Sequence, residues 1–201
     1  AMGYQAKASA SKSIALGYKA VASANGAKAF GGFGSGVGTT ASAEGSTAIG
    51  DGASSTVSYK TAITTRPFAA LGDAQAGIFV MKAATTDATA TVLTSDSNSV
   101  GSGNQVVAAS DTCITFSGTV VAMQNGAQAY GSWKIEGLLV NDGGTTTVPN
   151  SAITVIHNSS SWGLALSADD TNNALKIQVT GEASHNIRWV SNIQTSEVTF
   201  A

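Results

Sequence analysis

The sequence is poor in charge, cysteine and long apolar runs, and each shortage argues against a class of protein. Only 11 % of its 201 residues are charged, and no basic stripe carries interleaved aromatics, so we expect no nucleic-acid partner. The single cysteine, Cys113, excludes an intrachain disulfide and a cysteine metal cluster, and its strand-like neighbours predict a small buried side chain. No apolar run approaches the roughly 18 residues of a membrane span, so we expect no membrane insertion.

A repeat dominates the first third of the chain. Residues 3–63 divide into four blocks of fourteen residues, with a five-residue insert, GGFGS, at residues 31–35. Each block begins with glycine, carries alanine at its last position but one and ends with a large apolar side chain. The blocks are residues 3–16, 17–30, 36–49 and 50–63. A short fixed period of this kind predicts a solenoid in which each block is one coil stacked on the next.

The composition of one coil predicts how the coils assemble. Two short strands and two turns use up fourteen residues, and the first glycine allows a tight corner. Alanine suits a narrow interior but buries little apolar area, so a single thin rod gains little stability from its own core. We therefore expect the large residues that end the blocks to pack against other copies of the chain. Three-fold packing is the simplest closed arrangement, which predicts an elongated homotrimer.

The fourteen-residue period ends before Pro67, and the chain changes character there. Proline cannot donate a hydrogen bond to a strand ladder, so it is a natural end for the stacked coils. We expect a repeat shaft over residues 1–63, a transition over 64–73 and a β-rich tip domain over 74–201.

The tip sequence is typical of short strands joined by polar turns, with no helical stretch. Residues 174–180 alternate most clearly, and this pattern predicts that Leu175, Ile177 and Val179 face inward. The other expected strands near the C-terminus are residues 132–140, 152–157, 162–166, 186–190 and 196–200. The expected fold class is all-β, with a tip that resembles an antiparallel β-sandwich.

Two segments carry a family resemblance. Residues 13–17 (SIALG) and 46–50 (STAIG), each near an Ala-x-Ala-Ser segment, resemble the head repeats of trimeric autotransporter adhesins. That resemblance implies a left-handed parallel β-roll. Residues 131–136 (GSWKIE), 175–181 (LKIQVTG) and 187–190 (IRWV) are similar to C-terminal domains of bacteriophage tail fibres.

These resemblances imply a function in attachment. We expect the receptor-binding fragment of a phage tail fibre, located on the virion, whose three tips bind a bacterial surface multivalently. Polar loops with an occasional aromatic residue favour a polysaccharide or lipopolysaccharide receptor over a protein. The alternatives are a trimeric adhesin head on the bacterial cell surface, a polysaccharide depolymerase and a purely structural spacer.

Candidate ligand-binding residues lie in the polar turns of the tip. Trp162 follows four polar residues and could stack on a sugar ring, although a core position at the start of a strand is the alternative. Asn158 is a second candidate, in the loop before Trp162. Asp170, Asn172 and Asn173 are further candidates, although side chains of these types often only hydrogen-bond their own turn.

No motif for catalysis or metal binding is recognisable. The sequence lacks a Gly-x-Ser-x-Gly elbow, and no two carboxylates can be assigned to a shared cleft. His157 and His185 have no partner at metal-ligand spacing, so only three copies of one histidine on a trimer axis could hold an ion. We therefore expect no catalytic residue, no enzyme activity, no metal and no cofactor.

Overall fold

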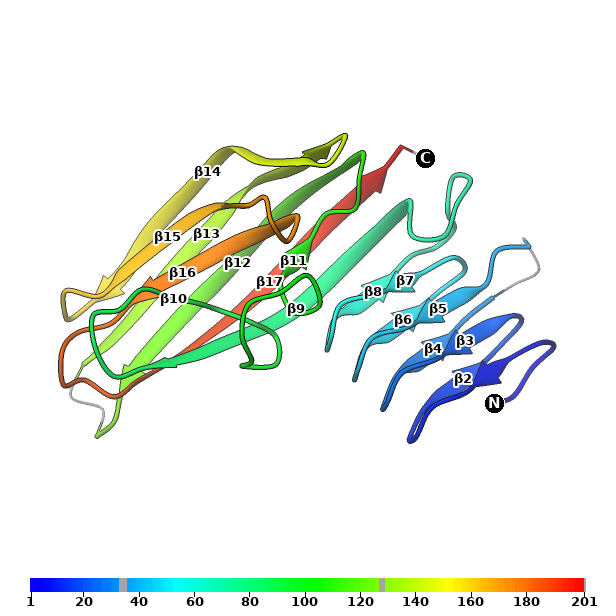
Figure 1. The fold of residues 1–201 in the computed structure, drawn as a ribbon, viewed down its shortest axis with the longest axis horizontal. Coiled ribbons are helices and arrows are strands. Elements are labelled where there is room, and N and C mark those ends of the chain that lie inside the picture. Colours follow the sequence, from blue (N-terminus) through cyan, green and yellow to red (C-terminus); the bar gives the residue numbers. More distant parts are fainter. Residues whose placement is uncertain (33–35, 127–128, 201) are drawn as a thin grey trace.

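The computed structural model describes residues 1–32, 36–126 and 129–200. The described residues form seventeen strands and no helix, so the all-β prediction is confirmed and none of these residues lies in a helix able to cross a membrane. The molecule is elongated, with the N-terminal coils at one end and a group of loops from the tip at the other (Figure 1).

The N-terminal coils stack through two parallel sheets, because each coil contributes one strand to each sheet. One sheet consists of β1 (Lys7–Ala8), β3 (Ala20–Ala22), β5 (Thr39–Ala41) and β7 (Ser54–Ser55). Opposite it stack β2 (Ile14–Leu16), β4 (Lys28–Phe30), β6 (Thr47–Ile49) and β8 (Thr61–Ile63).

Alanine fills the space between these two sheets, as the sequence predicts. In the second sheet the alanines lie in register, Ala15 beside Ala29 and Ala29 beside Ala48. The fully buried alanines that pack together are Ala15, Ala20, Ala22, Ala27, Ala29, Ala41, Ala48 and Ala53. Their neighbours in sequence point the opposite way, and so Leu16, Ile49 and Ile63 are each about 40 % exposed.

The corner glycines also stack, but the third coil begins at Gly31 and not at Gly36. A Cβ on Gly17 would run into the carbonyl oxygen of Gly31, and a Cβ on Gly31 would lie 2.6 Å from the carbonyl oxygen of Gly50. A Cβ on Gly36 would meet nothing within 4 Å. The third coil is therefore longer than the others and contains the GGFGS insert, of which residues 33–35 lie outside the described residues.

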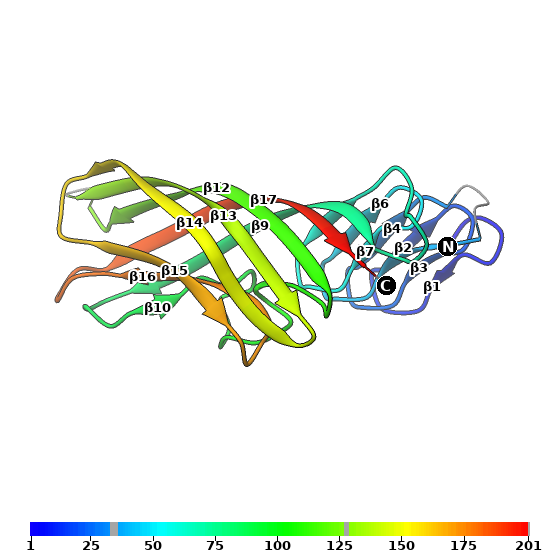
Figure 2. The same cartoon turned by 90° about the horizontal axis from the view of Figure 1, so that it is seen from above.

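The tip consists of a large antiparallel sheet packed against a smaller one (Figure 2). The large sheet has the order β14 (Thr145–Asn158), β13 (Tyr130–Asp142), β12 (Thr112–Gln124), β17 (Ile187–Thr199) and β9 (Ala74–Thr85). In the small sheet β15 (Gly163–Asp169) lies along β16 (Ala174–Thr180), which also pairs with β10 (Thr91–Val92) and β11 (Val106–Val107).

The core lies between the two sheets of the tip. Leu175, Ile177 and Val179 are fully buried, which confirms their predicted inward orientation. Trp133 stacks on Trp189 with ring centroids 5.6 Å apart. The prediction for Cys113 was wrong: it is only half-buried, on the face of β12 turned away from the small sheet. We call this face of the large sheet the outer face.

The last strand is longer than the sequence suggests. Residues 186–190 and 196–200 read as two separate strands, because the intervening Ser191 to Thr195 segment is largely polar. The structure has one strand, β17, which is paired along its length with β12 on one side and β9 on the other. Pairing on both edges satisfies the backbone of the polar segment, so no turn is needed.

The coils and the tip share one sheet. β8 pairs antiparallel with β9, with Ala62 beside Gly77 and Ile63 beside Ala76. The coil sheet of β2, β4, β6 and β8 therefore continues into the large sheet of the tip, which gives nine strands in a row. The outer face is consequently continuous from the first coil to β14.

Candidate functional site

Loops from four parts of the sequence gather at the end of the tip farthest from the N-terminal coils (Figure 1). Strand register explains their meeting, because Ile187 pairs with both Gln124 and Thr85, and Gly131 pairs with Asn158. The described residues of these loops are 86–90, 125–126 with 129, 159–162 and 181–186. We call this the loop end, and its predominantly polar composition makes it the candidate binding region.

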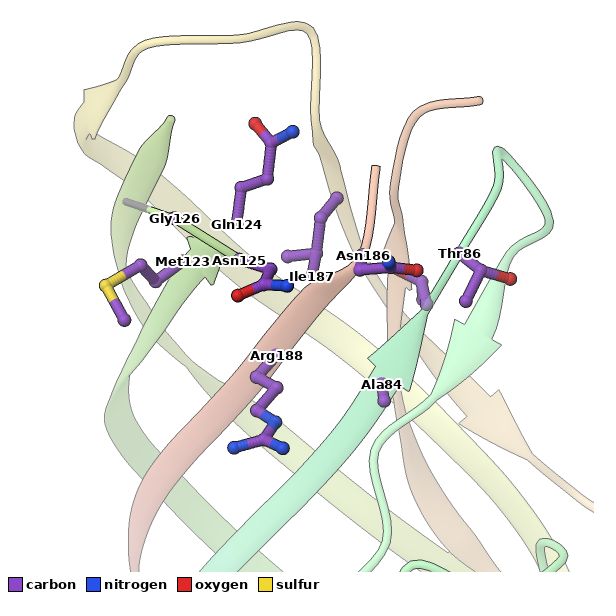
Figure 3. A pocket seen from close by; sticks show the side chains of 10 residues that line it. Ala84, Thr86, Met123, Gln124, Asn125, Gly126, Asn186, Ile187 and Arg188 are labelled. Atoms are coloured by element: carbon purple, nitrogen blue, oxygen red, sulfur yellow. The ribbon is translucent and has the colours of Figure 1, made fainter. Parts of the chain in front are cut away.

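A hollow lies across the ends of three neighbouring strands, β12, β17 and β9, at the loop end (Figure 3). Arg188 and Met123 lie on the outer-face side of this hollow, while Thr86, Asn125 and Asn186 come from the loops. The side chains of these three loop residues form no hydrogen bond with another described residue. They can therefore offer amide and hydroxyl groups to a ligand.

An exposed aromatic pair lies next to this hollow on the outer face. Tyr130 pairs in register with Met123, and its ring stacks on His157 with centroids 5.0 Å apart and an interplanar angle of 21°. Tyr130 is 54 % exposed. Tyr130 was not predicted as a site residue, and His157 was considered only as an ion ligand on a trimer axis. Their contact depends on a β-bulge between β13 and β14 that places Ile156 out of register.

The loops themselves are tied together by a small polar cluster. Ser160 Oγ donates a hydrogen bond to Glu182 Oε2 at 2.6 Å, and His185 Nδ1 lies 3.4 Å from the same oxygen. Both residues contact the same carboxylate oxygen, and no hydrogen bond joins the histidine to the serine hydroxyl among the described residues. The arrangement thus connects loop 159–162 to loop 181–186 but lacks the serine–histidine contact of a nucleophilic triad.

Trp162 does not have the exposed position that stacking on a sugar would require. Its side chain is 3 % exposed, and its ring packs at a tilted angle against Trp189 with centroids 5.6 Å apart. The structure therefore supports the alternative, a core residue at the start of a strand. Asn158 holds the loop in place, because its Nδ2 donates to the carbonyl oxygen of Trp162 at 3.0 Å.

The other three candidates lie at the opposite end of the tip, in the turn between β15 and β16. Asp170 accepts a hydrogen bond from the backbone N–H of Thr146 at 2.6 Å, and Asn173 Oδ1 accepts from Thr146 Oγ1 at 3.1 Å. Asn172 donates to Asp169 within the turn at 2.9 Å. These side chains dock the small sheet onto the start of β14, so the candidates do not form one site with Asn158; their binding role stays a prediction.

The N-terminal coils match one known family of sequence repeats. The model of the YadA head domain repeat (2 copies) matches residues 1–20, 11–33 and 34–53. No curated protein sequence matches the chain.

Two solved structures of phage tailspikes are similar to this chain. The tailspike protein gp49 of Acinetobacter baumannii bacteriophage Fri1, a capsular polysaccharide depolymerase, has a TM-score of 0.39 at 11 % identity. That comparison covers 72 % of this chain and 22 % of the tailspike. The tailspike of Acinetobacter baumannii phage AM24 has a TM-score of 0.29 at 11 % identity, with 60 % and 26 % of the two chains covered. This chain thus spans about a quarter of the length of either tailspike.

The first of these structures contradicts one prediction. The lack of a recognisable catalytic motif predicted no enzyme activity, whereas gp49 is a capsular polysaccharide depolymerase. The prediction of no enzyme activity therefore does not stand. The physical reason is that carboxylates brought together by folding or by assembly need no sequence motif.

Proposed function

We propose that this chain is the shaft and tip of a receptor-binding fibre on a phage tail, which attaches the virion to a polysaccharide of the bacterial surface. Residues 1–63 form the shaft as a left-handed parallel β-roll, residues 64–73 the transition and residues 74–201 the tip. Three copies assemble side by side, so that three weak sites act together and gain avidity.

The main support for this proposal is the position and composition of the loop end. Polar loops and the exposed Tyr130–His157 pair lie at the end of the molecule farthest from the coils, on a sheet that runs without interruption from one to the other. A rigid sheet can hold such a surface at a distance from the virion. Amide and hydroxyl groups beside an exposed aromatic ring suit a sugar, since the ring offers apolar area and the polar groups offer hydrogen bonds.

Support for the trimer comes from a row of large apolar residues on the outer face of the coils. Leu16, Phe30, Ile49 and Ile63 lie in register on four successive strands, and Ile63 is followed by Ala76 of β9. We call these four residues the apolar row. An exposed continuous row of this kind marks a surface that packs against another protein, and identical copies present identical rows.

Light scattering coupled to size exclusion tests the trimer. We expect about three times the 20.0 kDa chain mass for the wild type. Ile49→Asp places a charge in the apolar row and should shift the mass towards that of one chain. Thr40→Asp is the matched control, because Thr40 faces outward from the other coil sheet, and it should leave the mass unchanged. A monodisperse wild-type monomer with a folded β spectrum would contradict the trimer.

Binding to purified capsular polysaccharide, lipopolysaccharide and whole cells tests the attachment function. We expect saturable binding of the wild-type fragment and competition with the intact phage for its host. Release of reducing ends is measured in the same samples: steady release would assign a depolymerase, and binding alone would assign an attachment module. A fragment that binds neither cells nor any polysaccharide would be a structural spacer, and the proposal would be wrong.

A second candidate function is the head of a trimeric adhesin on the bacterial cell surface. The match of the YadA head domain repeat to residues within 1–53 favours it. The tip favours the phage fibre, because the sheet of the coils continues directly into a β-rich domain that carries the loop end. Antibodies against the chain would label virion tails in the first case and the cell envelope in the second.

A further inference from the structure

Two cations on the outer face near the loop end have no counter-charge within the described residues. Lys82 of β9 and Arg188 of β17 are both exposed, and neither side chain forms an ion pair or hydrogen bond with another described residue. Arg188 pairs in register with Ala84, and Lys82 pairs with Val190. The two cations are thus diagonal neighbours on adjacent strands, with backbones roughly 7–8 Å apart.

Arg188 stands between two hollows of the surface. The first is the hollow at the loop end, with a volume of about 360 Å³, which includes Thr86, Asn125 and Asn186. The second, of about 430 Å³, lies along β9 and β17 and is bordered by residues of segment 91–98. Lys82 and Asn98 line this second hollow, and Arg188 lines both. Their volumes fall within the roughly 300–1,000 Å³ of small-molecule sites.

No acidic residue lines either hollow within the described residues. The acids nearest in sequence are engaged elsewhere: Asp87 accepts from the N–H of Thr89 at 2.7 Å, and Asp96 accepts from Asn104 Nδ2 at 2.9 Å. Lys134, farther along the same face, is by contrast paired with Glu136 at 3.0 Å. The two hollows therefore form a local positive surface on a chain whose net charge is −2.

We propose that the two hollows around Arg188 bind an acidic polysaccharide, one whose repeating unit carries a carboxylate. The guanidinium of Arg188 can hold a carboxylate by two parallel hydrogen bonds, and the ammonium of Lys82 attracts the next negative group along the chain. The loop amides and the hydroxyls of segment 91–98 face the sugar hydroxyls. This inference rests on the proposed attachment function and specifies its ligand class and location.

The test uses the whole chain and a panel of purified capsular polysaccharides, each presented native and after chemical reduction of its carboxyl groups. We expect binding to members that contain uronic acid, and its loss when the carboxylates are reduced to alcohols. Arg188→Gln should weaken binding of a uronic-acid oligosaccharide by at least about tenfold, because a charge-assisted hydrogen bond is lost. Lys82→Gln should weaken it less, and raising the salt concentration should weaken it further.

Lys134→Gln is the matched control, since it removes a cation from the same face that is already paired, and it should leave binding within about twofold. Equal binding of native and carboxyl-reduced polysaccharide, or an unchanged affinity in Arg188→Gln, would overturn this inference while the attachment function stands. Failure of the wild type to bind any panel member or whole cells would overturn both. A change of oligomeric mass in Arg188→Gln would instead assign this face to contact between copies.

Discussion

Lys60 Nζ lies 2.7 Å from Glu197 Oε2, and this ion pair joins the last coil to the last strand of the tip. Both side chains are buried, with 4 % and 6 % exposed. The carboxylate also accepts hydrogen bonds from Gln75 Nε2 at 2.8 Å and from Thr195 Oγ1 at 2.6 Å. The ammonium lies 5.3 Å from the centre of the Phe79 ring. Because both charges are buried, removal of either one leaves the other as an uncompensated charge in the protein interior, which is strongly destabilising.

Removing one partner of this pair should cost far more than removing both. Lys60→Met leaves the buried Glu197 carboxylate without its cation, and we expect a loss of about 3–5 kcal/mol in the free energy of unfolding. Adding Glu197→Gln should recover part of that loss, so the two changes should not be additive. Urea unfolding followed by circular dichroism measures each variant. Lys134→Met, at an exposed pair, should cost less than about 1 kcal/mol, and strict additivity of the buried pair would contradict the coupling.

The corner glycine of the third coil can be identified by a matched pair of substitutions. Gly31 and Gly36 both have positive φ, at 150° and 90°, so both positions disfavour alanine on backbone grounds. Only at Gly31 does the added Cβ meet the backbone of the next coil. Gly31→Ala should therefore lower the unfolding free energy by about 1–3 kcal/mol more than Gly36→Ala. If Gly36→Ala instead loses as much unfolding free energy as Gly31→Ala, or more, then Gly36 is the corner glycine of the third coil, as the fourteen-residue blocks indicate.

Asp73 should make stability depend on acid pH. Desolvation of its carboxylate opposes ionisation, but the N–H groups of Ala70, Ala69 and Phe68 donate to it and hold its pKa below the usual value. A carboxyl whose pKa is lower in the folded state contributes stability that is complete above the unfolded pKa, near 3.9, and is lost as the pH falls through the folded pKa.

Asp73→Asn removes that contribution. We expect the variant to be less stable than the wild type at pH 7, and the difference to shrink as the pH falls below about 4. Urea midpoints between pH 7 and pH 2 measure both trends. Asp142→Asn, at an exposed position of β13, should leave the free energy of unfolding at pH 7 within about 0.5 kcal/mol of the wild type. A difference between Asp73→Asn and wild type that widens with acid would refute the linkage.

Because Trp162 is buried, its substitution should lower the stability of the fold and should not act directly on ligand binding. Trp162→Ala should cost about 3–5 kcal/mol, because the ring packs against Trp189 in the core. Trp162→Phe should cost less, since it keeps an aromatic ring and removes an indole N–H that has no hydrogen-bond partner among the described residues. Tyr130→Ala, at an exposed aromatic nearby, should leave thermal stability nearly unchanged. A Trp162→Ala variant that is fully stable but binds polysaccharide more weakly would show that Trp162 contacts the ligand and is not a core residue.

Much of the fold was predictable because local pattern and tertiary environment agree. The period of fourteen residues and the inward alanines follow from the repeat, and the inward side of residues 174–180 follows from their alternation. The candidate site was harder to predict. Asn158 and Trp162 were identified as loop residues, but the same argument selected Asp170 and its neighbours, which lie at the opposite end of the tip.

An all-β chain of stacked coils and strands follows from the sequence alone, because glycine corners, alanine interiors and two-residue alternation act on local backbone geometry. The contacts between residues far apart in sequence depend instead on the tertiary fold. Strand pairing turned the polar 191–195 segment into strand and brought Tyr130 onto His157. It also placed Lys82 and Arg188 on one face without a neighbouring acid. Register between distant strands sets these contacts, and neither composition nor period encodes it.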